Sequence, residues 1–259
     1  INGMPLSFIE VKRQNNREGI LTERNRMERR FGNKIYRRFV GITQFTVFSN
    51  NNEYDDSDIE PIQGAFYASS SYTRMFFSKF REQREEELKA KMKPINTEDE
   101  AFILSDTNLI AIKGTPEYAS SINEDSPTNR IITSLYTKDR ILFLLKYGIC
   151  YKTTTNKDGI TQIEKHIMRY PQMFATMAIR DKLREGIRKG VIWHTQGSGK
   201  TALAYSNVRY LTDYFSREEG KIAKFYFIVD RLDLAEQAKS EFEARGLNVK
   251  MIKDKKQFI

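Results

Sequence analysis

Residues 190–201 carry the clearest chemistry of the sequence, in the run Gly-Val-Ile-Trp-His-Thr-Gln-Gly-Ser-Gly-Lys-Thr. A short apolar strand is predicted to enter a small loop with two glycines, and a helical pattern follows. Glycines let backbone N–H groups close around phosphate oxygens, and a helix N-terminus adds its partial positive charge. Lys200 would reach the outer phosphates of a nucleotide, and the Thr201 hydroxyl would ligate Mg²⁺. The predicted phosphate-binding residues are Gln196, Gly197, Ser198, Gly199, Lys200 and Thr201.

A second chemical pattern is Glu10-Val11-Lys12, at the end of a predicted apolar strand. Residues i and i+2 of a strand share a face, so both charged side chains would point into one small volume. Glu10 would then hold a divalent metal ion, while Lys12 orients or activates the attacking water. The alternative is chance, because the E-x-K pattern is common in proteins. A carboxylate that interrupts an apolar strand nevertheless needs a metal or a cation to offset its desolvation.

The formal net charge of the 259 residues is +9. This basic surplus predicts a polyanionic partner, chiefly nucleic acid. Residues 1–40 hold ten Lys and Arg against four Glu, and an acidic stretch at 53–60 follows, although a solvated helix face and a loop also explain both. A single cysteine, Cys150, excludes an internal disulfide and predicts a reducing compartment, the cytoplasm. No apolar run approaches the roughly eighteen residues of a membrane span.

The first half of the chain predicts strands between charged helices. The polar residues 115–129, which include two prolines, predict a loop. Strands are predicted over residues 6–12, over residues 43–49 and around Phe66. Helices are predicted over residues 18–40, with a break at Gly32, and over residues 81–93.

The pattern changes near residue 150, where we predict a boundary between domains 1–150 and 151–259. Two β-branched stretches flank Asn156-Lys157-Asp158-Gly159 and predict a hairpin. From Pro171 onward the pattern runs helix, glycine loop, helix, strand, helix. That alternation is typical of a parallel α/β sheet.

Residues 193–201 resemble motif I of superfamily 2 motors, in the form found in type I restriction R subunits. His194 stands where the generic loop has glycine. The segment Arg169-Tyr170-Pro171-Gln172 resembles the adenine-recognising segment of this family, in which Gln172 would read the base edge. The alternative is that Pro171 only begins a helix and Gln172 faces solvent.

Residues 227–237 resemble motif Ia of the same family, which ends a parallel strand and faces DNA. The resemblance implies that Asp230 and Arg231 contact DNA. The alternative is that Asp230 only caps the helix that begins at Arg231.

Residues 2–12 resemble the nuclease hairpin that type I R subunits carry ahead of the motor, with its turn at Asn2-Gly3. The resemblance implies a PD-(D/E)xK nuclease in which Glu10 and Lys12 are catalytic and Glu10 binds the metal. The nuclease aspartate would precede the first residue, so we expect a piece of a longer protein. Many R subunits carry Gln-x-x-x-Tyr on the next helix, and this chain has no clear equivalent.

Together these likenesses imply an α/β chain: a mixed-sheet PD-(D/E)xK nuclease-like domain, then the start of a RecA-like P-loop domain with a parallel sheet. They imply ATP and Mg²⁺ as cofactors, double-stranded DNA as substrate, and modification and specificity subunits as partners. The expected activity is ATP-dependent DNA translocation with endonucleolytic cleavage. Two alternatives stay open: a superfamily 2 translocase whose first domain is only structural, and a non-catalytic DNA-binding adaptor. No Walker B element follows Thr201, so this chain alone is predicted to be inactive.

Overall fold

The computed structural model describes residues 3–16, 18–54, 63–71, 74–106, 109–155 and 157–252. The chain divides into two compact units, Ile1–Phe143 and Leu144–Ile259, and each is described by itself. Asn2, Asn156 and most of the acidic stretch 53–60 lie outside the described residues. None of the described helices is long and apolar enough to cross a membrane.

The first unit is built on a four-stranded sheet in the order β1-β2-β3-β4. β1 (Ser7–Val11) runs parallel to β2 (Phe45–Ser49), which pairs antiparallel with β3 (Ala65–Ala68). The two-residue strand β4 (Ser78–Lys79) pairs antiparallel with β3. The three predicted strands and the mixed sheet are confirmed. Every residue of β2 and β3 is buried, so these strands form the middle of the core.

A charged helix packs its apolar face on this sheet. α1 (Gly19–Gly32) is followed by a 3-10 helix (Lys34–Tyr36) and α2 (Arg37–Ile42), which confirms the predicted helix and its break. Apolar residues at helical spacing on α1 join the strands in one cluster. The members include Ile20, Met27, Phe31, Phe48 and Phe66. The first unit also contains α4 (Thr97–Asp106), a 3-10 helix (Ile110–Gly114) and α7 (Lys138–Phe143).

The loop predicted over residues 115–129 is wrong, because two helices occupy that segment. α5 (Pro116–Ile122) and α6 (Pro127–Leu135) each begin at a proline. The hydroxyls of Thr115 and Ser126 accept hydrogen bonds from backbone N–H groups in the first turns. Proline has no N–H to leave unpaired there, and its fixed φ suits a helix start. The prolines therefore mark helix starts.

Glu82 lies buried just before α3 (Glu85–Lys89), which is shorter than the helix predicted over residues 81–93. Its carboxylate accepts hydrogen bonds from Ser134 Oγ at 2.5 Å and from the buried guanidinium of Arg140. Burial alone would raise the pKa of Glu82. The hydrogen bonds from Arg140, Ser134 and a backbone N–H outweigh it and hold the pKa below its ordinary value. This pair fastens the segment before α3 to α6 and α7.

Replacing Glu82 by alanine should clearly destabilise the first unit. Removing one member of a buried ion pair leaves the other charge buried and costs about 3 kcal/mol or more. Because the folded pKa of Glu82 lies below 4.5, the stability lost in Glu82→Ala should be largest above pH 4.5 and shrink as the pH falls below it. Urea denaturation over a pH series measures this. The control Glu86→Ala, whose side chain is 92% exposed, should unfold like wild type, and a wild-type midpoint for Glu82→Ala would contradict the assignment.

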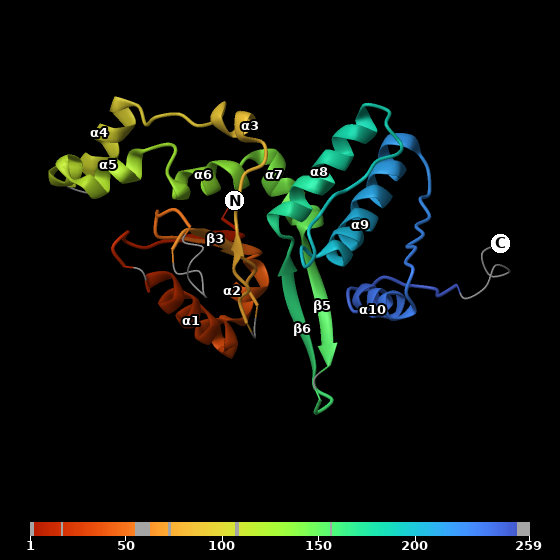
Figure 1. Ribbon diagram of the computed structural model, residues 1–259. Coiled ribbons are helices and arrows are strands. Elements are labelled where there is room, and N and C mark those ends of the chain that lie inside the picture. The colour runs from red at the N-terminus through yellow and green to blue at the C-terminus, as the bar shows by residue number, and fades with distance from the viewer. Residues whose placement is uncertain are drawn as a thin grey trace. The chain divides into compact units, whose positions relative to one another are not determined.

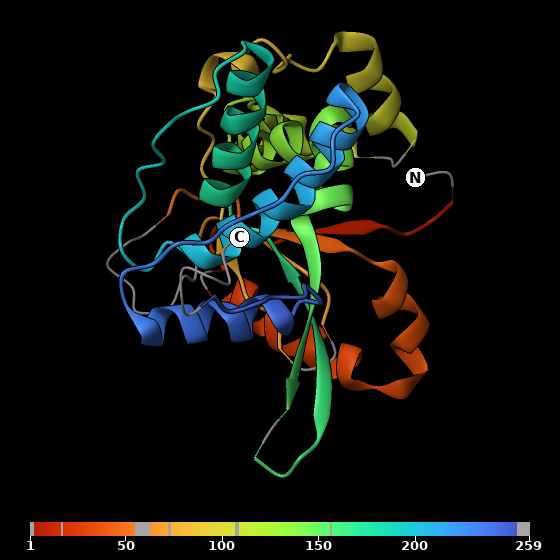
Figure 2. The same cartoon turned by 90° about the vertical axis from the view of Figure 1, so that its right-hand side faces the viewer.

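The second unit begins with a π-helical turn (Leu144–Gly148) and the predicted hairpin, which is confirmed. β5 (Ile149–Thr155) and β6 (Thr161–Ile167) pair antiparallel along their whole length. α8 and α9 lie side by side in both views (Figure 1, Figure 2). The α-helices of the described part of this unit are α8 (Tyr170–Arg184), α9 (Lys200–Glu219) and α10 (Leu232–Glu243).

No strand forms at residues 190–193 or 227–229, where the sequence predicts strands of a parallel sheet. Val191 and Trp193 are each 90% exposed, and Ile228 is 85% exposed. A strand makes no hydrogen bonds within itself and forms only beside a partner strand. Among the described residues of this unit, β5 and β6 are the strands that pair. The predicted RecA-like sheet is therefore not formed in the described part of the chain, and the RecA-like arrangement stays a prediction.

Candidate functional sites

Glu10 and Lys12 lie together at the end of β1, as their spacing predicts. Lys12 Nζ is 2.5 Å from Glu10 Oε1, and the two side chains are 20% and 29% exposed. The pairing with β2 continues past the strand, since the Lys12 N–H donates to the Ser49 carbonyl at 2.7 Å. The charged pair thus lies at the carboxyl ends of two parallel strands, where α/β sheets commonly bind ligands.

Glu23 is a further charged residue of this site, and the E-x-K motif does not identify it. Its Oε2 atom lies 2.9 Å from Lys12 Nζ, and Arg26 pairs with the same carboxylate. The Glu23 side chain is 1% exposed. One sequence signal was present: Glu23 stands three residues after Ile20 and four before Met27, on the apolar face of α1. A carboxylate in such a position requires a cationic partner.

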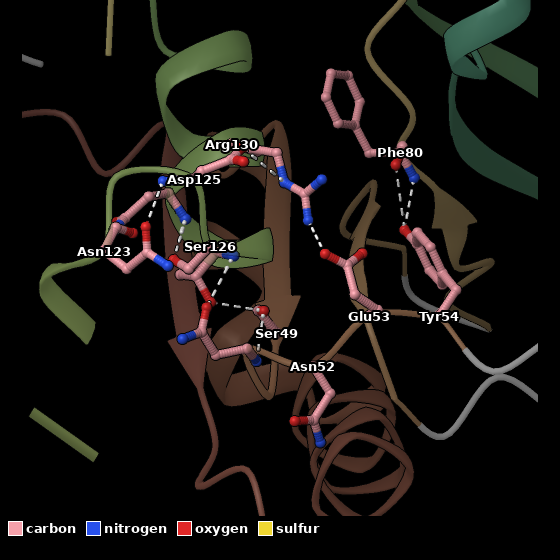
Figure 3. A network of polar contacts seen from close by, with 12 residues as sticks. Ser49, Asn52, Glu53, Tyr54, Phe80, Asn123, Asp125, Ser126 and Arg130 are labelled. Carbon is pink, nitrogen blue, oxygen red and sulfur yellow. Dashed lines mark hydrogen bonds and ion pairs between the residues drawn. The ribbon is translucent and has the colours of Figure 1, made fainter. Parts of the chain in front are cut away.

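A hydrogen-bonded turn holds the end of β2 (Figure 3). Asn51 has a φ of 59°, which residues other than glycine rarely adopt. Its side chain accepts a hydrogen bond from the Thr128 N–H at 3.1 Å, and Ser49 Oγ lies 2.8 Å from Thr128 Oγ1. Arg130 pairs with Glu53 beside them. These contacts fasten the turn to α6 and so fix the strand end that borders β1.

A complete metal cage is absent from the part of the chain that the structure describes: no group of three or more His, Cys, Asp or Glu could hold an ion there. Mg²⁺ is commonly bound by one or two carboxylates, with water and substrate phosphates as its other ligands. Glu10 fits such a site because its side chain is partly exposed at a strand end. Glu23 fits less well, since its buried carboxylate is shared by Lys12 and Arg26.

In the second unit, residues 195–199 form a tight loop that leads into α9. Gly197 and Gly199 have φ values of 75° and 84°, in the left-handed region that a side chain would strain. Ser198 Oγ donates to the Thr195 carbonyl at 2.8 Å. Both predicted glycines are therefore at positions that need glycine.

Lys200 begins α9 and folds back across the loop. Its Nζ donates to the carbonyls of His194 and Thr195 at 2.9 and 3.0 Å. Gln196 is exposed and Thr201 is half-buried in the first turn of α9. A phosphate at the helix N-terminus would compete with the two carbonyls for the ammonium group.

Gln172 is buried against this loop, so the alternative that it faces solvent is wrong. Its Oε1 accepts from the Arg169 N–H at 2.8 Å, and its Nε2 donates to the carbonyls of Ser198 and Gly199 at 3.3 and 3.2 Å. The residue is 4% exposed. Pro171 does lie in the first turn of α8. Pro171 therefore begins the helix while Gln172, beside it, contacts the loop. To hydrogen-bond an adenine base, Gln172 would have to give up one of its three hydrogen bonds.

The start of the hairpin and the π-helical turn before it hold α9 and thereby the loop. Arg209 donates to the carbonyls of Ile149 and Lys146 at 2.6 and 2.9 Å. Lys146 Nζ lies 2.6 Å from Asp213 Oδ2. Burial would raise the pKa of Asp213, but hydrogen bonds from Lys146 and Tyr147 hold it below its ordinary value. The position of the glycine loop thus depends on residues far from it in sequence.

Asp230 and Arg231 lie exposed at the start of α10. Arg231 is the N-cap residue and no side chain caps the helix, so the alternative that Asp230 is the cap is wrong. Arg231 Nη2 lies 2.6 Å from Asp233 Oδ2, with both side chains largely exposed. The guanidinium is accessible, and its contact with DNA stays a prediction.

Gly199→Ala should weaken ATP binding more than Gly197→Ala. A methyl group at either position meets an unfavourable φ, which costs about 1–2 kcal/mol, or about tenfold in affinity. Only at position 199 would it also collide with Gln172 Nε2, whereas position 197 is open. Calorimetry with ATP and Mg²⁺ measures the affinity of both variants. The control is Gly190→Ala, because a methyl group there meets open space and the backbone has no positive φ. Wild-type affinity in Gly199→Ala would contradict the assigned loop.

Residues 165–258 match the family described as "Type III restriction enzyme, res subunit", a P-loop helicase-type domain. The matched residues contain α8, the glycine loop, α9 and α10. They therefore include every part of the predicted phosphate site described above.

Curated proteins similar to this chain are endonuclease subunits. The MjaVIIP subunit of Methanocaldococcus jannaschii, assigned to a type I restriction enzyme, is 36% identical over 109 residues, 40% of this chain and 10% of that protein. Type I subunits of Staphylococcus saprophyticus and Staphylococcus aureus are 39% and 36% identical over 75 residues, 29% of this chain and 8% of each protein. The chain resembles a type I restriction endonuclease subunit. This confirms the resemblance seen in the motifs, although the chain spans only about a tenth of these relatives. No solved structure matches.

Proposed function

We propose that this chain is part of a cytoplasmic restriction subunit that hydrolyses ATP to translocate double-stranded DNA and cleaves unmodified DNA. The observation that carries the proposal is the loop before α9, where two left-handed glycines, Lys200 and the buried Gln172 come together. This loop lies within the segment that matches restriction enzymes. The similarity to type I endonuclease subunits supports the restriction activity.

The loop would hold ATP by its phosphates. Backbone N–H groups of residues 196–201 would surround the phosphate oxygens at the start of α9. Lys200 would exchange its two carbonyl partners for phosphate oxygens, and Thr201 would help to hold Mg²⁺. Gln172 would release one carbonyl of the loop to reach the adenine edge. When bound, ATP supplies the free energy for DNA movement.

Glu10 and Lys12 would carry out the cleavage. The Glu10 carboxylate would hold Mg²⁺, which when bound stabilises charge on the phosphate that is attacked. Lys12 would orient the attacking water from the same face of β1. The exposed Asp230 and Arg231 would contact DNA, and modification and specificity subunits would supply sequence recognition.

One observation favours a second candidate, a superfamily 2 translocase with a structural first domain. The ammonium of Lys12 is paired with both Glu10 and Glu23, an arrangement that would also serve only to join β1 to α1. A non-catalytic DNA-binding adaptor is disfavoured, because the glycines and Lys200 of the loop are intact.

In the whole subunit assembled with its partners, Lys12→Ala and Lys200→Ala should separate two activities. Lys12→Ala should lose cleavage by about a hundredfold or more and keep DNA-stimulated ATPase activity and translocation. Lys200→Ala should lose all three, because cleavage at a distance depends on DNA movement. Triplex displacement measures translocation, and plasmid cleavage is measured beside it. Wild-type cleavage by Lys12→Ala would remove the nuclease assignment and favour the translocase.

DNA binding by this chain should be non-specific and sensitive to salt. Binding through Lys and Arg to phosphates releases counterions, so affinity should fall about tenfold or more between low and physiological salt. Fluorescence anisotropy with two duplexes of unrelated sequence measures this. A salt-independent preference for one duplex would show that base contacts dominate instead.

A further inference from the structure

The ammonium group of Lys12 lies between two carboxylates that differ in exposure. Glu10 Oε1 is 2.5 Å away on β1 itself, and its side chain is 29% exposed. Glu23 Oε2 is 2.9 Å away on α1, and its side chain is 1% exposed. The pairs thus form a chain of charges from the core to the partly exposed end of β1.

Stability alone does not explain a carboxylate at position 23. The apolar face of α1 places Ile20, Met27 and Phe31 in the core, and Glu23 lies on the same face. A buried ion pair commonly stabilises a protein less than well-packed apolar side chains of similar volume. Arg26 could pair with a glutamate on the exposed face of the helix just as well. The contact that requires a buried carboxylate is the one with Lys12.

We propose that Glu23 is a positioning residue for Lys12 in the cleavage reaction, an inference that rests on the proposed nuclease function of Glu10 and Lys12. A cation bound by Glu10 repels the ammonium of Lys12 and draws the Glu10 carboxylate away from it. Glu23 holds the ammonium from the other side, and Arg26 holds Glu23. Lys12 therefore keeps its place on the face of β1 where water attacks, while Glu10 is free to bind the metal.

The test is Glu23→Gln in the whole subunit assembled with its partners. The amide has nearly the same shape but no charge. We expect cleavage to be slower by about tenfold to a hundredfold, as displacement of a catalytic group by about 1 Å produces. ATPase activity and translocation should match wild type. The Mg²⁺ concentration for half-maximal cleavage should stay within about twofold of wild type.

The matched control is Glu18→Gln, next to the start of the same helix with an exposed side chain, which should cleave like wild type. The double variant Glu23→Gln/Arg26→Gln removes the buried carboxylate together with its partly exposed cationic partner and guards against unfolding of the single variant. If it folds, it should show the same slow cleavage. Thermal unfolding of every variant separates loss of fold from loss of position.

The outcomes distinguish this inference from the proposed function. If Lys12→Ala is inactive while folded Glu23→Gln or the double variant cleaves at the wild-type rate, the positioning role is wrong and the nuclease stands. A large rise in the Mg²⁺ requirement of Glu23→Gln would make Glu23 a metal ligand and also overturn the positioning role. If Lys12→Ala cleaves like wild type, the nuclease assignment itself fails, and the positioning role falls with it.

Discussion

Two hydrogen bonds, one at each end of β1, hold its parallel pairing with β2 in register. The Gln44 N–H donates to the Leu6 carbonyl and the Lys12 N–H to the Ser49 carbonyl, each at 2.7 Å. A shift of one residue would turn every side chain of β1 to the opposite face. The face of the sheet on which Glu10 and Lys12 lie, and the contact of Lys12 with α1, both depend on this register.

Glu23 and Glu82 are buried carboxylates of the first unit, and their surroundings differ in a way that bears on function. Glu82 is bound by Ser134 and Arg140, both more than fifty residues away, and these buried donors join separate parts of the core. Glu23 is bound by Arg26 of its own helix and by Lys12, which is 20% exposed. The Glu82 pair is enclosed by the core, as a structural tie requires. The Glu23 pair continues to the partly exposed strand end, where the proposed cleavage would take place.

In the second unit, residues outside the glycine loop hold it in place. Gln172 joins the loop to the start of α8, and Arg209 ties α9 to the hairpin. Tyr205 of α9 packs with Ala238 and Phe242 of α10. Among the described residues, the contacts that hold the loop and its helix therefore come from the helices and the hairpin.

The sequence by itself determined the features that depend on neighbours a few residues apart. The i, i+2 spacing of a strand brought Glu10 to Lys12, and glycine at 197 and 199 allowed the left-handed loop. The hairpin followed from its two β-branched stretches and the turn between them. Such features need only local backbone geometry, so their residue types are sufficient.

Only the tertiary structure decided which distant groups meet. It brought Glu23 to Lys12 across eleven residues and Gln172 to Gly199 across twenty-seven. It also left residues 190–193 without strand structure, although their composition favours a strand. A strand needs a partner for its backbone, and a buried charge needs a counterion brought by packing. The sequence of the strand or of the charged segment does not reveal its partner, because the partner strand or counterion lies elsewhere in the fold.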